Sequence, residues 1–192
     1  MTLFRQQAFH IERVRGQAVL LVERFDRRPD GSRDHVLSAR TLLQVPEGSL
    51  DLDGSYPALA ALLRKQGTSA DIGERWFERM AFNIVLANID DHALNHLFGW
   101  DGKWLRLMPA FDLEPCGSRD EGRHQMRITK DSFQGSLENA AAAAAEFGLS
   151  SRQAARCIDH IRGEFEGSWR SVASNLGCTA VLQGHIQAGL RL

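Results

Sequence analysis

Two aspartates and an asparagine are the residues of this sequence that are best suited to chemistry. Asp90 is followed five positions later by Asn95, and Asp112 comes after a stretch that reads as a tight hairpin. Carboxylate and carboxamide oxygens are ligands that Mg²⁺ accepts, and a further carboxylate can take a proton from a hydroxyl group. Phosphoryl transfer needs little more, because it depends mainly on positioning and on neutralising charge. The spacing therefore predicts a phosphoryl-transfer site built on these three residues.

A helix is expected to lead into this site. Apolar residues recur at helical spacing from Asp71 onward, so Asp90 and Asp91 should lie just past the end of a helix. Carboxylates are disfavoured there by the negative pole of the helix dipole, and a bound cation would offset that cost. A plain solvated loop is the alternative interpretation of residues 88–92, because Asn and Asp are common in turns. The asparagine and the later aspartate at this spacing favour the functional interpretation.

A hairpin is expected to bring the last of the three residues back to the others. Between Leu97 and Leu107, two apolar arms flank Asp101-Gly102, a dipeptide that suits a tight turn. Such a hairpin would return Asp112 to the neighbourhood of Asn95 despite their separation in the sequence.

Several segments of the chain resemble the HipA-like serine/threonine kinases, which include bacterial toxins of toxin–antitoxin pairs. The resemblance covers the chain from about residue 17 to about residue 177, and its most specific part runs from Asn88 to Pro115. The segments that carry it are Val22–Arg27, Ser55–Arg64, Phe82–Asn95 and Leu107–Pro115.

The resemblance implies roles for the predicted site residues. Asp90 would be the catalytic base, and Asn95 and Asp112 would be the ligands of Mg²⁺ beside bound ATP. His92 would lie near the ribose and phosphates. Taken by itself, His92 reads as an ordinary loop histidine, so its role rests on the resemblance.

The resemblance also implies a hinge between two kinase lobes. Main-chain groups at Glu23 and Phe25 would meet the adenine edge, and Asp26 would lie near the ribose and phosphates. From the residues alone, the stretch from Gln17 to Phe25 reads as a plain buried strand, because Val19 to Val22 is a continuous apolar run.

The parts of a complete kinase that should precede the hinge are missing from this sequence. No Gly-rich phosphate loop precedes it, and the chain's three lysines, Lys65, Lys103 and Lys130, all follow it. We therefore expect a mainly α-helical, protein-kinase-like C-terminal lobe with small β-hairpins, formed by one domain over residues 1–192. Residues 1–27 would supply remnant N-lobe strands and the hinge, and residues 28–192 the helical lobe. The chain alone is expected to be inactive.

The remaining elements are expected to be scaffold. Caps and apolar spacing predict helices at Ser38–Leu43, Tyr56–Gln66 and Ala140–Ala145, from about Ser150 to about Asn175, and at Thr179–Leu190. A β-hairpin is expected to pair Ala8–Val14 with Ala18–Glu23, and a short strand is expected at Met126–Ile128.

Composition narrows the classes of function. A net charge of −1 and a pI near 6.7 give no signal for binding a polyanion, so no direct contact with nucleic acid is expected. Cys116, Cys157 and Cys178 lack the spacing of a zinc site or disulfide framework, which favours a reducing cytoplasm. We find no signal-peptide core and no apolar run of membrane-spanning length, so no membrane contact is expected.

Three functions are compatible with these features. The first is a HipA-like serine/threonine protein kinase lobe that transfers phosphate from Mg-ATP to a protein substrate in a complete assembly, as the toxin of a toxin–antitoxin pair. Its partners would include an N-lobe subunit or a HipB-like DNA-binding antitoxin. The second is a truncated, non-catalytic kinase-like module that acts through a protein partner. The third is a metal-dependent phosphohydrolase that uses Asp90, Asp91, His92 and Asp112.

Overall fold

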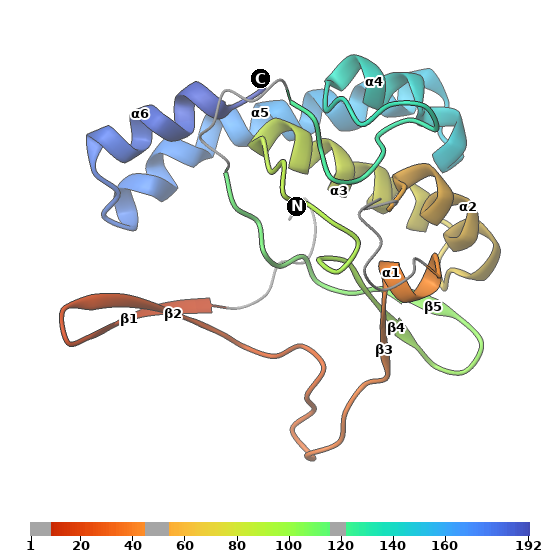
Figure 1. Ribbon diagram of the computed structural model, residues 1–192, viewed down its shortest axis with the longest axis horizontal. Coiled ribbons are helices and arrows are strands. Elements are labelled where there is room, and N and C mark those ends of the chain that lie inside the picture. The colour runs from red at the N-terminus through yellow and green to blue at the C-terminus, as the bar shows by residue number, and fades with distance from the viewer. Residues whose placement is uncertain (1–8, 45–53, 116–121) are drawn as a thin grey trace.

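The chain folds into a mostly helical structure with two small antiparallel sheets (Figure 1). The computed structural model describes residues 9–44, 54–115 and 122–192. The mainly α fold with small hairpins that the sequence predicts is therefore confirmed. Ala8 and Cys116, which entered the sequence predictions, lie outside the described residues.

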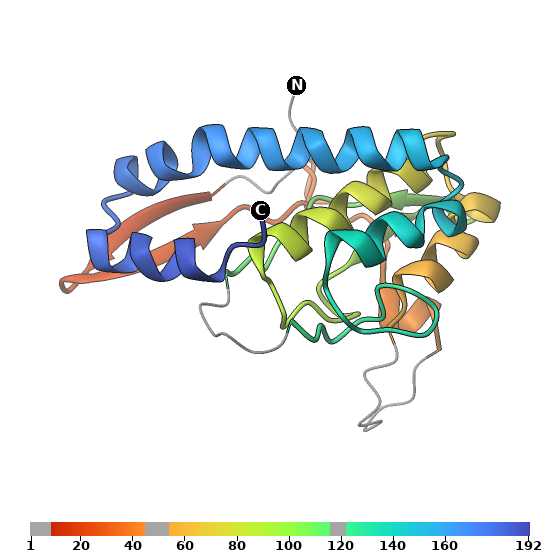
Figure 2. The same cartoon turned by 90° about the horizontal axis from the view of Figure 1, so that it is seen from above.

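The core forms around helix α3 (Ile72–Leu86), whose apolar stripe is fully buried. Helix α2 (Tyr56–Gln66), helix α4 (Leu137–Ala142), the 3₁₀ helix η1 (Ala144–Phe147) and the long helix α5 (Ser151–Asn175) pack around α3 (Figure 2). At Gly73 the backbone of α3 approaches η1 so closely that a Cβ would overlap the main-chain oxygen of Phe147. The large side chains that fill this core are Trp76, Phe77, Met80, Ile84 and Phe147.

Local signals in the sequence explain where the helices begin. Ser55 caps α2 by accepting a hydrogen bond from the Ala58 main-chain N–H, and Ser150 forms a capping box with Gln153 at the start of α5. Helix α3 ends at Ala87, which adopts the left-handed conformation with φ of 54°. The chain therefore leaves α3 abruptly, directly before the loop that carries Asp90.

A three-stranded sheet holds the predicted hairpin. Strand β3 (Val36–Ser38) pairs with β4 (Leu97–Trp100), which pairs with β5 (Leu105–Leu107), and the short helix α1 (Ala39–Leu42) follows β3. The turn between β4 and β5 is closed by Asp101, whose Oδ1 accepts hydrogen bonds from the main-chain N–H groups of Lys103 at 2.9 Å and Trp104 at 2.8 Å. Phe98 is fully buried and anchors the sheet to the core.

The N-terminal hairpin lies outside this core. Strand β1 (Phe9–Val14) pairs with β2 (Gln17–Val22), as predicted, and the ribbon projects to one side of the helices (Figure 1). Arg15 and Gly16 both have positive φ, which matches the tight turn that suits the twist of a hairpin. The interpretation of this stretch as a buried strand is wrong, because all of β1 and every residue of β2 except Val19 are exposed.

The C-terminal segment returns to the central helix. Helix α6 (Ala180–Gly189) follows α5, and the main-chain N–H of Arg191 donates to the carbonyl oxygen of Val85 at 3.0 Å. The short strand expected at Met126–Ile128 does not form, because Arg127 makes only an isolated parallel bridge with Ser55. Among the described helices, none has the length and apolar character needed to cross a membrane.

Candidate functional site

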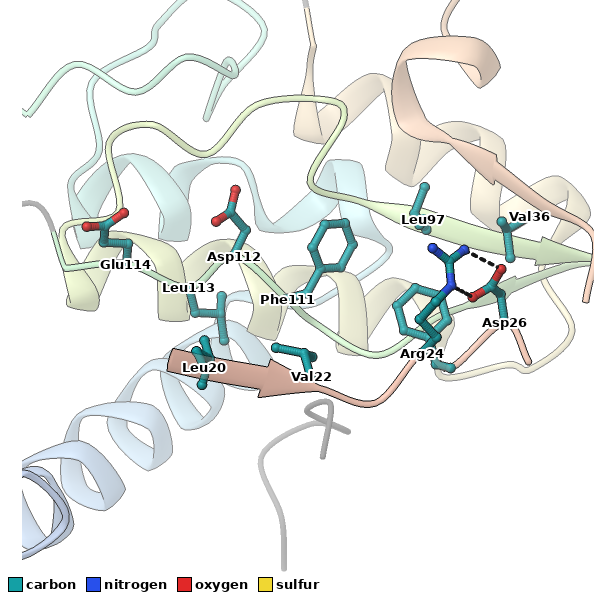
Figure 3. A pocket seen from close by; sticks show the side chains of 11 residues that line it. Leu20, Val22, Arg24, Asp26, Val36, Leu97, Phe111, Asp112, Leu113 and Glu114 are labelled. Atoms are coloured by element: carbon teal, nitrogen blue, oxygen red, sulfur yellow. Dashed lines mark hydrogen bonds and ion pairs between the residues drawn. The ribbon is translucent and has the colours of Figure 1, made fainter. Parts of the chain in front are cut away.

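A pocket of about 650 Å³ opens where β2, the predicted hinge segment (residues 24–26), the three-stranded sheet and the segment after β5 meet (Figure 3). This volume is within the usual range for small-molecule sites, roughly 300–1,000 Å³. Apolar side chains make up most of its wall, and four charged side chains also line it. The lining residues are Leu20, Val22, Arg24, Phe25, Asp26, Val36, Leu97, Phe111, Asp112, Leu113 and Glu114.

The hinge segment forms one end of the pocket. Arg24 donates to both carboxylate oxygens of Asp26, with Nε–Oδ1 at 2.9 Å and Nη2–Oδ2 at 2.7 Å (Figure 3). These hydrogen bonds hold the pKa of Asp26 below its ordinary value. Phe25 lies against Phe111 with ring centroids 6.1 Å apart, so the hinge and the segment before Asp112 are in contact. Two stretches far apart in the sequence thus meet at the pocket.

Asp112 is the predicted metal ligand that lines this pocket. Its side chain is exposed and takes part in no hydrogen bond or ion pair within the part of the chain that the structure describes. Its backbone has φ of 56°, which is unusual for a residue with a side chain. Its main-chain oxygen accepts a hydrogen bond from Asn88 Nδ2 at 3.2 Å. The carboxylate is therefore held in place by its backbone and is available to a ligand.

The other predicted site residues do not line this pocket. Asp90 is exposed and Asn95 is 7% exposed, and the side chains of both make no hydrogen bond among residues 9–44, 54–115 and 122–192. His92 is half-buried, and its Nδ1 is buried with no partner in the described chain. Glu23 lines a smaller neighbouring hollow. The structure brings Phe25, Asp26 and Asp112 together, and the roles of the remaining residues stay predictions.

Asp91, the neighbour of the predicted base, belongs to a buried polar cluster. The carboxylate is 1% exposed, accepts a hydrogen bond from the Tyr56 hydroxyl, and pairs with His96 Nε2 at 2.9 Å. Burial alone would raise the pKa of Asp91, but the charge of His96 and the hydrogen bonds from His96 and Tyr56 hold it below its ordinary value. The two adjacent aspartates are thus in opposite environments, one in solvent and one in the core.

The cluster continues to the pocket wall. Asn83 Nδ2 donates to the Tyr56 hydroxyl at 3.0 Å, and Asn88 Nδ2 donates to Asn83 Oδ1 at 3.2 Å as well as to the main chain of Asp112. Arg79 Nη2 donates to the carbonyl oxygen of Met108 at 2.7 Å, and burial lowers the pKa of Arg79 to about 10. Because buried polar groups that are satisfied resist displacement, this network fixes the loop after α3 against the segment that carries Asp112.

The phosphohydrolase alternative does not fit this arrangement. It requires Asp91 as a metal ligand, yet that carboxylate is occupied by Tyr56 and His96. Nor do the described residues contain any group of three or more His, Cys, Asp or Glu that could hold a metal ion.

Sequence reasoning missed the residues that organise the site. Asn83 lies inside the apolar stripe of α3, where a polar side chain must find a partner, so its position was a usable signal. Phe111 and Glu114 also line the pocket, and the prediction gave them no role in the site. Nothing in their spacing separates them from scaffold residues.

A solved structure of another protein has the same fold as this chain. A solved structure of a similar protein is HipA from the Shewanella oneidensis MR-1 toxin–antitoxin system, in complex with HipB and its operator DNA. The two share 18% sequence identity with a TM-score of 0.73 over 96% of this chain. The chain spans about half, 49%, of that HipA chain. The curated protein sequences contain no significant match. A model of the HipA-like C-terminal domain matches residues 4–169, and the chain therefore belongs to this family.

Proposed function

We propose that this chain is the nucleotide-binding and catalytic C-terminal lobe of a HipA-like serine/threonine protein kinase. One observation carries the proposal: the hinge segment and Asp112, which the family assigns to adenine and to Mg²⁺, line a single pocket of about 650 Å³. A hinge that contacts adenine and an aspartate that faces the phosphates are the two ends of an ATP site in this class of enzyme.

The pocket's residues have separate tasks in this proposal. The apolar wall, which includes Leu20, Val22 and Phe111, excludes water from the adenine ring. Asp112 and Asn95 would hold Mg²⁺, which when bound neutralises charge on the phosphates. Asp90 would accept the proton of the substrate hydroxyl, a role that suits an exposed carboxylate with no competing partner among the described residues.

The partners that we propose for this chain are inferred from those of the similar HipA protein. HipA in the solved complex is assembled with HipB and operator DNA, so we infer that this chain works as the toxin of a pair with a HipB-like DNA-binding antitoxin. Its substrate would be a serine or threonine of another protein. A cytoplasmic location, where ATP and Mg²⁺ are available, belongs to the same inference.

A second lobe is needed to complete the site. Six apolar residues of the β1–β2 hairpin are 40% to 59% exposed, and two of them also line the pocket. Apolar surface gathered in this way usually marks a binding surface. We infer that an N-lobe, whichever polypeptide supplies it, covers the hairpin and brings the phosphate loop and lysine. The 192 residues alone would then bind ATP weakly and show no transfer above background.

Two substitutions test the assigned roles. Asp112→Ala should weaken binding of Mg-ATP, whereas Asp90→Asn should leave that binding nearly intact and abolish phosphotransfer in an assembly supplied with an N-lobe. Asp159→Ala, at an exposed position on α5, is the matched control and should change neither measurement. Isothermal titration with Mg-ATP and a radiolabelled transfer assay provide the two readouts. Equal loss of nucleotide binding in the Asp90 and Asp112 variants would refute the separation of roles.

The non-catalytic alternative has one observation in its favour, which is the same exposed hairpin. A module that acts only through a partner would need this surface but not the site residues. It predicts that Asp90→Asn and Asp112→Ala leave partner binding unchanged and that no assembly transfers phosphate. Mg²⁺-dependent labelling that disappears in Asp90→Asn would exclude it.

A further inference from the structure

A second pocket, of about 450 Å³, lies where the segment after the hinge meets the β4–β5 hairpin. It shares no lining residue with the candidate ATP pocket, and the proposed kinase function makes no use of it. Its wall combines indole rings with guanidinium groups. The lining residues are Arg28, Ser32, Arg33, Asp34, His35, Thr68, Gly99, Trp100, Asp101, Trp104 and Arg106.

Two tryptophans are exposed in this pocket. Trp100 and Trp104 are 39% and 40% exposed, whereas the other two tryptophans of the chain, Trp76 and Trp169, are 0% and 8% exposed. The His35 ring stands edge-on to Trp100 with centroids 5.4 Å apart, which fixes that indole from one side. Leaving such large apolar rings in water costs free energy that burial against a ligand would recover.

Arg33, one of the arginines beside these rings, has no charged partner among the described residues. Asp34 accepts hydrogen bonds from Arg28, with Nε–Oδ1 at 2.8 Å, and from Arg106 at 3.4 Å, and the bonds from Arg28 hold the pKa of Asp34 below its ordinary value. Asp101 is occupied by main-chain N–H groups of its own turn. Arg33 is exposed and has no hydrogen bond or ion pair from its side chain among the described residues. One guanidinium thus faces the pocket without a carboxylate.

We propose that this pocket binds a nucleotide, with the base stacked on Trp100 and the phosphate bound by Arg33, because Lys103 Nζ already lies over the Trp104 ring, 4.9 Å from its centroid. Stacking on aromatic side chains binds any base, because every base presents a π face, and a guanidinium matches phosphate with two parallel hydrogen bonds. An acidic peptide would satisfy the arginine but would leave the indoles without a planar partner. The nucleotide is either a free mononucleotide or one unit of a single-stranded nucleic acid.

The four tryptophans make the test site-specific. In the chain labelled with ¹⁵N at its indoles, AMP should shift the Trp100 signal and leave those of Trp76 and Trp169 in place. Adenosine and inorganic phosphate should each bind at least about tenfold more weakly than AMP, because each keeps only one of the two interactions. A short single-stranded oligonucleotide that binds more tightly than AMP would assign the ligand to nucleic acid, and the reverse order to a free nucleotide. No shift of the Trp100 indole with AMP or oligonucleotide would overturn the proposal.

Substitutions separate this site from the candidate ATP pocket. Arg33→Ala should weaken AMP binding at the indoles about tenfold or more, whereas Arg152→Ala, at an exposed position on α5, should not change it. Asp112→Ala should leave the indole titration unchanged even where it removes Mg-ATP binding. An Arg33→Ala chain that binds AMP as the unchanged chain does would overturn the assignment of the phosphate.

Discussion

The adjacent residues Asp90 and Asp91 allow one substitution to be tested in two opposite environments. Asp90 is exposed and unpaired among the described residues, whereas Asp91 is 1% exposed and contacts two buried partners. Those partners, Tyr56 and His96, are 0% and 2% exposed. Replacing either aspartate with asparagine keeps the shape of the side chain, removes its charge and turns one acceptor oxygen into an amide donor. We expect Asp91→Asn to destabilise the fold and Asp90→Asn to leave it intact.

The size of the expected loss of stability in Asp91→Asn follows from the burial of Asp91. Weakening the hydrogen bonds to a buried carboxylate typically costs about 1.5–3 kcal/mol, because hydrogen bonds to a charged group are stronger than those to a neutral one. An asparagine at position 91 can still accept the hydrogen bond from Tyr56, so we expect a loss near the lower bound, about 1.5 kcal/mol. For a chain of this size, 1 kcal/mol lowers the melting temperature by about 2–4 °C, so Asp91→Asn should lower it by about 3–6 °C. Asp90→Asn should change the free energy of unfolding by less than about 0.5 kcal/mol.

Urea unfolding at pH 7, followed by circular dichroism, measures both values on the same scale. The pH dependence adds a second check. Because the folded pKa of Asp91 is depressed, its contribution is present above about pH 4 and is lost as the pH falls through the folded pKa. The difference between the two variants should therefore shrink in acid. Equal stability of the Asp90 and Asp91 variants at pH 7 would refute the reasoning.

Two further predictions concern buried positions of the fold. Burial lowers the pKa of His124 to about 4, and an unfolded histidine titrates near 6.5. Between these values the unfolded state binds more protons, so the free energy of unfolding should fall by up to about 3 kcal/mol as the pH drops from about 6.5 to 4. Urea unfolding across this pH range should show a smaller loss of the free energy of unfolding in His124→Leu than in the unchanged chain. An equal loss in both would show that His124 does not cause the pH dependence. Gly73→Ala should destabilise the fold by about 1–3 kcal/mol in thermal unfolding, because its Cβ would overlap the main chain of Phe147. Gly163→Ala, where a Cβ meets open space on α5, is the control and should be neutral or stabilising; a similar loss in both would refute the close contact.

The helices were predictable because their signals are local. Ser55 and Ser150 are cap residues next to apolar stripes of helical period, and both begin helices where the sequence predicted. The β4–β5 turn followed from Asp101-Gly102 in the same way. Each signal lies within a few residues of the element that it specifies, so no knowledge of tertiary contacts was needed.

The candidate site was less predictable because its organisation is not local. The role of Asp91 depends on Tyr56, which lies 35 positions earlier, and the backbone of Asp112 is held by Asn88, 24 positions earlier. Equal residue types at positions 90 and 91 gave no indication that one would be buried. The interpretation of β2 as a buried strand, the alternative to a hinge, failed for a related reason, since an apolar run shows that a surface needs cover but not which part of an assembly covers it.

The exposure of β2 and the incomplete wall of the pocket have a common physical cause. The wall of the candidate ATP pocket includes Leu20 and Val22, which are 59% and 44% exposed. The opposite wall, at Phe111 and Asp112, is held to the core through Asn88 and Arg79. One side of the pocket is therefore fixed by buried polar contacts, while the other stands on a ribbon that packs little against the helices (Figure 1). A lobe that covers the ribbon would bury its apolar face and fix the hinge side of the pocket at the same time, so docking of the lobe and assembly of the nucleotide site should be coupled.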